Sequence, residues 1–193
     1  MSTSLPPTRS QRLKAATTDL HDRLDTRIMA LDPFAAPERY VRFLRVQQAF
    51  HAALGPLYAD PVLQALVPDL AERDRSAAIA ADLSAVALPP PAVPDAASVA
   101  ASDVPAALGW LYVAEGSSLG AAFLIKAAQR IGFDADHGAR HLAGHPDGRA
   151  AHWRRFTAAV DDAAMTEADE ARMIGAARTA FARFAALTEA AFA

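Results

Sequence analysis

The stretch Leu108-Gly-Trp-Leu-Tyr-Val-Ala-Glu-Gly-Ser-Ser-Leu-Gly-Ala121 decides the fold of this 193-residue chain. It lies inside an apolar segment from Pro105 to Ile131 that is hydrophobic almost all round, a pattern typical of a buried helix. Glycine in a helix interior costs roughly 0.5–1 kcal/mol relative to alanine, so Gly116 and Gly120 indicate a bend or a close contact. Their spacing of four leaves one side of the helix bare, and Gly109, seven residues before Gly116, broadly continues this strip.

Outward from this segment the chain is helical in both directions, because Ala, Leu, Arg and Glu dominate and apolar residues recur every three or four positions. No strand pattern and no internal repeat is evident. The sequence therefore indicates an all-α fold in a single domain over residues 1–193, with residues 1–9 as a flexible N-terminus. Besides the central segment, we expect helices at about 10–31, 37–57, 62–66, 70–86, 150–163 and 166–192, with loops at 89–105 and 134–149.

The expected helix ends are marked by residues with defined backbone preferences. Ser10 is expected to cap the first helix, and Asp32-Pro33 ends it. Gly55-Pro56 is expected to interrupt the end of the second helix. Thr166 is expected to cap the last helix, whose first turn is acidic, as the helix dipole favours.

Composition excludes several classes of protein. Hydrophobic residues make up 52% and charged residues 21%, which indicates a globular chain, and the net charge of −3 argues against a nucleic-acid binder. Cysteine is absent, which excludes disulfides, thiolate ligands and a cysteine nucleophile, so any metal would be held by histidine or oxygen. The sequence shows neither a signal peptide nor an apolar run of about 20 residues, which indicates a soluble, cytoplasmic protein without a membrane.

One face of the first helix carries Lys14, Thr17 and His21, with Lys14 roughly 10 Å along the axis from His21. A helix with an imidazole, facing a helix with a bare backbone, describes a slot for haem: the imidazole binds the iron and the lysine reaches a propionate. Two other interpretations stay open. His21 can be an ordinary partly buried histidine, and Gly116 and Gly120 can serve close helix packing.

The string Leu13-Lys-Ala-Ala-Thr17-Thr-Asp-Leu-His21, together with the stretch 108–121, resembles the proximal and distal helices of bacterial haem oxygenases. Their order, their separation of about 95 residues and the chain length also fit, so the resemblance covers nearly the whole chain. It implies haem sandwiched between a proximal and a kinked distal helix, with His21 as the axial iron ligand. Haem would be both cofactor and substrate, cleaved with O2 and electrons from an external reductase to biliverdin, CO and ferrous iron.

The resemblance also implies roles for residues around the haem. Gly116 and Gly120, with Ser117 between them, would make room for O2. Gln47 and His51, one turn apart, match a pair that organises proton-delivering water in similar enzymes. Further candidates for this network are Arg75, Trp153 and Asp22, although a core tryptophan and two surface charges explain them equally well.

Two residues bear on the regiochemistry of cleavage. Lys14 and Tyr112 match the propionate anchors of similar bacterial enzymes, a pairing that goes with the alpha isomer of biliverdin, while Lys126 is expected at the surface. No flavin or nicotinamide fingerprint is present, so we expect a separate electron donor such as a ferredoxin, a flavodoxin or their reductase. A biliverdin acceptor such as a phytochrome is a further expected partner.

Two rival functions stay open. The chain can be a haem carrier or sensor without turnover, although Gly116, Gly120, Gln47 and His51 together favour turnover. Thiaminase or quinone-cofactor oxidase relatives share such a helical scaffold, but they leave Lys14 and the glycines unexplained.

Two other clusters, one of histidines and one of arginines, are candidate binding sites in the sequence. His137, His141 and His145 are spaced for a metal site on one helix face, but the glycines and the proline among them argue against a continuous helix. Arg149, Arg154 and Arg155 form the densest basic cluster. It can steer an acidic electron donor, but a solvated helix face is the favoured interpretation.

Overall fold

The protein is described by a computed structural model covering residues 6–94 and 97–193. Within these ranges it contains helices and no strand, apart from one isolated bridge between Asp134 and Gly138. The all-α expectation is confirmed. The elements are α1 (Arg9–Leu31), α2 (Pro37–Tyr58), α3 (Pro61–Leu66), the 3-10 helix η1 (Leu70–Arg73), α4 (Ser76–Val86), α5 (Val104–Arg130), the 3-10 helix η2 (Arg140–Leu142), α6 (Arg149–Asp162) and α7 (Glu167–Phe192).

The first helix begins earlier than predicted. Thr8, not Ser10, is the N-cap, and it forms a capping box with Gln11. The Thr8 hydroxyl accepts a hydrogen bond from the Gln11 backbone amide, and the Gln11 side-chain oxygen accepts one from the Thr8 backbone amide. Ser10 instead donates from its amide and hydroxyl to the Asp161 carboxylate, at 2.6 and 2.9 Å. Residues 1–5 of the predicted flexible N-terminus lie outside the described residues, but Arg9 is held by bonds to backbone carbonyls of α6.

Two other helix ends also differ from the prediction. Helix α2 continues through Pro56 to Tyr58, because Pro56 is exposed and falls in the last turn, where one missing amide removes a single bond. The expected helix 70–86 is divided into η1 and α4 at residues 74–75. The ends at Asp32 and Thr166 are as predicted, Thr166 forming a capping box with Asp169.

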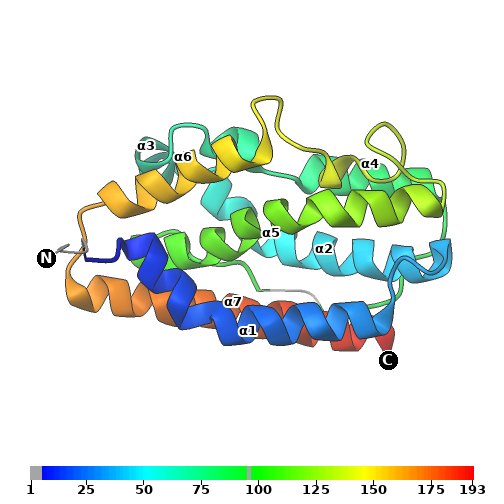
Figure 1. Ribbon diagram of the computed structural model, residues 1–193, viewed down its shortest axis with the longest axis horizontal. Helices are drawn as coiled ribbons and strands as arrows, with labels where there is room; N and C mark the ends of the chain where they lie inside the picture. Colours follow the sequence, from blue (N-terminus) through cyan, green and yellow to red (C-terminus); the bar gives the residue numbers. More distant parts are fainter. Residues whose placement is uncertain (1–5, 95–96) are drawn as a thin grey trace, which may run out of the picture.

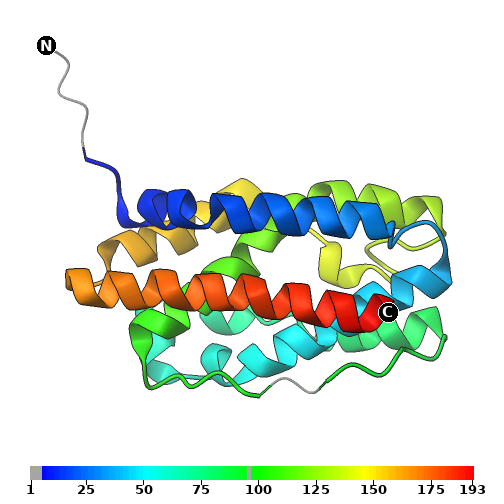
Figure 2. The ribbon, with the colours of Figure 1, turned by 90° about the horizontal axis from the view of Figure 1, so that it is seen from below.

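The long helices lie side by side around α5, which crosses the middle of the molecule in Figure 1. Helices α1 and α7 run parallel, since Arg12 pairs with Glu170 near their starts and Arg27 with Glu189 near their ends. Helix α2 runs antiparallel to α7, with Phe50 edge-on to Phe184. Figure 2 shows that α5 changes direction part-way along its length, as expected of a helix that carries glycines.

The glycines of α5 do not share one role. A Cβ at Gly109 would meet the backbone oxygen of Met173 at 2.2 Å, so this glycine lets α5 approach α7. The expectation that Gly109 continues the bare strip is therefore wrong. By contrast, a Cβ at Gly116 would only touch the Trp153 ring at 3.6 Å, and one at Gly120 would meet nothing within 4 Å.

By length and composition alone, α5 would be long and apolar enough to cross a membrane. Half of its most apolar window is buried inside the fold, and residues such as Leu108 and Leu111 are inaccessible. The core helix of a soluble protein passes the same test, so α5 serves here as core.

Candidate functional site

The histidine of α1 presents its ring to solvent. The His21 side chain is 57% exposed, and its Nδ1 lies 3.5 Å from a carboxylate oxygen of Asp22 and 3.6 Å from one of Asp25. Phe181 of α7 supports the ring edge-on at a centroid distance of 6.1 Å. Because the carboxylates face Nδ1, the ring is oriented to offer Nε2 to a ligand, the arrangement typical of metal-binding histidines.

Part of α5 is open and apolar. Phe123 is 78% exposed and Leu119 39% exposed, although both are large hydrophobic residues on a mostly buried helix. Gly120 lies between them with free space where a Cβ would project. Two large apolar side chains exposed one helical turn apart are candidates for contact with a ligand.

The side chains of Thr17 and Tyr112 link α1 to α5. Burial raises the pKa of Tyr112, and the neighbouring Thr17 hydroxyl acts in the opposite direction, so the two side chains meet across the helices. The Tyr112 ring also lies 5.3 Å from that of Trp153, which packs under Gly116. Lys14 is exposed on α1, one turn before Thr17.

Gln47 and His51, one turn apart on α2, and His141 are buried polar side chains, and the half-buried Arg75 lies near His51 and His141. Burial lowers the pKa of His51 to about 3, and the charges of Arg75 and His141 act in the same direction. His141 is fixed by the Asp82 carboxylate, which accepts from its amide at 2.9 Å and lies 2.8 Å from its Nδ1. Nδ1 of His51 and Nε2 of His141 are buried and have no hydrogen-bond partner among the described residues.

Asp22 and Ser117 lie elsewhere. Asp22 is exposed beside His21 on α1 rather than among these buried polar side chains, because residues on this outer helix face point to solvent. Ser117 is exposed and donates back to the carbonyl of Ala114 at 2.6 Å.

The sequence interpretation missed one buried ion pair. Glu115 accepts from Arg73 at 2.9 Å and from the Tyr58 hydroxyl at 3.2 Å, and burial raises its pKa. Arg73 also forms two bonds with Asp69. A carboxylate inside an apolar segment was the available signal, because a buried charge requires a partner.

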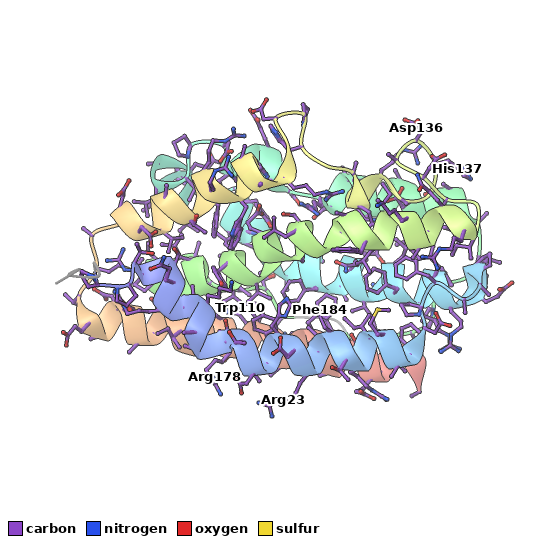
Figure 3. All side chains as sticks on the ribbon, in the orientation of Figure 1. Arg23, Trp110, Asp136, His137, Arg178 and Phe184 are labelled. Carbon is purple, nitrogen blue, oxygen red and sulfur yellow. The ribbon has the colours of Figure 1, made fainter. Side chains whose placement is uncertain are left out.

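In the structure, the members of the predicted histidine cluster and of the predicted arginine cluster have different surroundings. His137 lies out on a loop, on the edge away from α1 in Figure 3, while His145 stacks on His152 at 4.4 Å. No group of three or more metal-binding side chains occurs in residues 6–94 and 97–193.

In the arginine cluster, Arg155 pairs with Asp69 and Asp147, and Arg149 bonds to backbone carbonyls of Ser118 and Leu142. The solvated-face interpretation is therefore wrong for Arg149.

These features fit haem. A flat macrocycle needs an imidazole on one side, free space over a small residue on the other and apolar walls, which His21, Gly120 and Phe123 supply. The fold and the site define an all-helical haem-binding protein.

A family model described as Heme oxygenase matches residues 8–190, and the chain belongs to the haem oxygenase family. Heme oxygenase PigA of Pseudomonas aeruginosa is 41% identical over 185 residues, which cover 96% of this chain and 93% of PigA. The crystal structure of NO- and CO-bound heme oxygenase from Neisseria meningitidis matches with a TM-score of 0.91 and 41% identity, over 97% of this chain and 93% of that one. The protein is thus an oxidoreductase of the haem oxygenase class.

Proposed function

We propose that this enzyme opens haem at the alpha-meso carbon with O2 and electrons from a separate reductase, releasing biliverdin, CO and ferrous iron in the cytoplasm. The observation that supports the proposal is the exposed imidazole of His21 on α1, together with the free space over Gly120 on α5. When bound, haem supplies the iron that activates O2 and the ring that is oxidised. The side chains around the haem bind it, leave room for O2 and organise the water that delivers protons.

On the proximal side, His21 would hold the haem iron through its free Nε2. The carboxylates of Asp22 and Asp25 lie near Nδ1 and favour the ring orientation that leaves Nε2 for the iron. Thr17 is buried one turn before His21 and lines the slot, and Phe181 keeps the ring from turning.

On the distal side, Gly116 and Gly120 leave room for O2 next to the α5 backbone, with Ser117 between them. Protons reach the site through water held by Gln47, His51 and Arg75, with Trp153 shaping the passage. The unpartnered nitrogens of His51 and His141 support this role, since buried polar atoms of this kind bond to ordered water. Because its pKa is about 3, His51 stays neutral and organises water without acting as a strong acid.

The first test is spectroscopic and compares His21→Ala with His137→Ala, a loop histidine outside the slot. The parent and His137→Ala should bind one equivalent of hemin with a histidine-type Soret band that decays to biliverdin absorption under a ferredoxin system with catalase. His21→Ala should lose both properties. Unaltered spectra and turnover in His21→Ala would mean that another residue binds the iron, and haem that persists in the parent would indicate a carrier or sensor.

The alpha regiochemistry rests on Lys14, which is exposed on α1, and on Tyr112 of α5, which meets Thr17 of α1; both would hold the propionates. The double variant Lys14→Ala, Tyr112→Phe should convert a single alpha product into a mixture of isomers, resolved by chromatography. Lys126→Ala, which removes an exposed lysine elsewhere on α5, is the matched control and should keep the parental pattern. An unchanged pattern in the double variant would remove both residues as anchors.

The electron donor is proposed to be a small acidic protein such as a ferredoxin or flavodoxin, or their reductase. A phytochrome is a proposed acceptor of biliverdin. Turnover assays with each purified donor, and transfer of product to an apo-phytochrome, test these two partners separately.

A further inference from the structure

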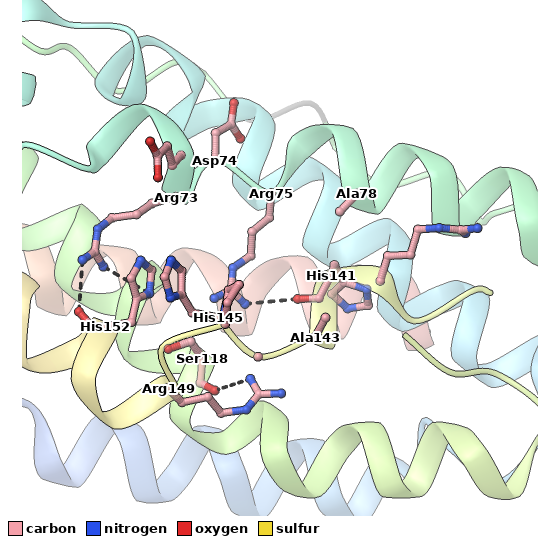
Figure 4. Close-up of a pocket in the computed structure, with 14 residues that line it drawn as sticks. Arg73, Asp74, Arg75, Ala78, Ser118, His141, Ala143, His145, Arg149 and His152 are labelled. Atoms are coloured by element: carbon pink, nitrogen blue, oxygen red, sulfur yellow. Dashed lines mark hydrogen bonds between the residues drawn. The ribbon is translucent and has the colours of Figure 1, made fainter. Parts of the chain in front are cut away.

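A polar cavity lies on the opposite side of α5 from the open glycine face. Ser118, which is two residues from both Gly116 and Gly120, points into it, as expected for positions about 200° apart on a helix. The rest of the wall comes from the segment before α4, from the loop that follows η2 and from the start of α6 (Figure 4). Arg75 and Arg149 enter this cavity from different elements.

Neither guanidinium is neutralised by a carboxylate of the described residues. Arg149 donates Nη1 to the Ser118 carbonyl at 2.8 Å and Nη2 to the Leu142 carbonyl. Arg75 donates Nη1 to the His141 carbonyl at 3.1 Å. A guanidinium has five N–H donors, so each arginine keeps several for another acceptor.

The nearby carboxylates are committed elsewhere or exposed. Asp82 holds His141 and the Arg140 amide, and Glu115 is paired with Arg73. Glu72 and Asp74 line the cavity from exposed positions. Arg75 and Arg149 are half-buried, whereas the Glu72 and Asp74 carboxylates are exposed, so water and salt screen these carboxylates more than the guanidiniums.

The two arginines also affect each other. Burial lowers the pKa of Arg149, and the charge of Arg75 lowers it further. His145 and His152 stack at the cavity wall, and burial, with the charge of Arg73 next, lowers the pKa of His152 to about 4. A bound anion would relieve the repulsion between the guanidiniums.

We propose that this cavity binds a small free oxyanion of the phosphate class between Arg75 and Arg149. The planar forks of two guanidiniums match the oxygen geometry of such an anion. Because Arg149 also holds the Ser118 carbonyl, the site is directly connected to α5, two residues from Gly120. This inference concerns the protein without haem, and the site shares Arg75 with the proposed water network.

The test is calorimetric titration of haem-free protein with sodium phosphate, with sodium chloride of equal ionic strength as the reference. Phosphate should bind saturably at one site. Arg149→Gln should weaken binding about tenfold or more, the effect of losing charge-assisted hydrogen bonds, whereas Arg154→Gln should not. Arg154 is the matched control because it is an exposed arginine of the same helix outside the cavity.

A second variant, His145→Asp, tests the proposal independently in case Arg149→Gln does not fold. His145→Asp places a negative charge in the wall at a half-buried position, and it should abolish phosphate binding while circular dichroism stays parental. The proposal is overturned if phosphate acts no differently from chloride, if His145→Asp binds phosphate normally, or if Arg154→Gln loses as much affinity as Arg149→Gln.

Discussion

Gly109 is the glycine of α5 at which adding a single methyl group should destabilise the fold most. In Gly109→Ala the new Cβ would lie 2.2 Å from the Met173 backbone oxygen, 3.0 Å from the Ala177 nitrogen and 3.1 Å from the Ala176 Cβ. Ordinary contacts begin at 3.4 Å, so α5 and α7 must separate locally by about 1 Å. The obstructing atoms are backbone, which cannot turn aside as a flexible side chain would.

The energetic consequence follows from two opposing effects. Overpacking a tight core costs about 1–3 kcal/mol, and exchanging glycine for alanine in a helix returns about 0.5–1 kcal/mol. Because the clash is severe, we expect a net loss of about 2 kcal/mol in the free energy of unfolding. Equilibrium urea denaturation of the haem-free protein measures this value.

The matched control is Gly175→Ala on α7, where a Cβ would meet nothing within 4 Å. It should gain about 0.5–1 kcal/mol from helix propensity alone. A Gly109→Ala protein as stable as the parent would refute the close approach of α5 to α7 at this point.

Two further predictions concern the site. Gly120→Leu should leave the unfolding free energy of the haem-free protein unchanged or raised, because the surroundings of Gly120 are open. The same variant should lower the affinity of the ferrous haem complex for CO and O2. Parental gas affinity would contradict the distal placement of Gly120. Neutral His51, with a folded pKa of about 3 against 6.5 when unfolded, contributes stability that is fully present above about pH 6.5 and is lost as the pH falls toward 3. Between pH 7 and 5 the parent should therefore lose about 2 kcal/mol more than His51→Gln in urea denaturation, and equal losses would show that His51 is not buried in its neutral form.

Local chemistry made much of the fold predictable. Helix α7 begins at Thr166 and α1 ends at Asp32 as predicted, because capping depends on residues close in the chain. The N-cap prediction was wrong by two residues at Ser10, because Asp161, far along the sequence, accepts a hydrogen bond from the Ser10 hydroxyl. Pro56 likewise stayed helical because only its position in the last turn, on the exposed side, decided the outcome.

The sequence by itself determined which residues share a helix face, and this placed Lys14, Thr17 and His21 on α1 and Gly116 and Gly120 on α5. Only the tertiary structure decided what each face meets. It turned Gly109 toward α7, brought Arg149 from α6 onto the Ser118 carbonyl, and joined Glu115 to Arg73. The physical reason is range: helix periodicity and capping act within a few residues, whereas contacts between helices depend on packing among segments far apart in the chain.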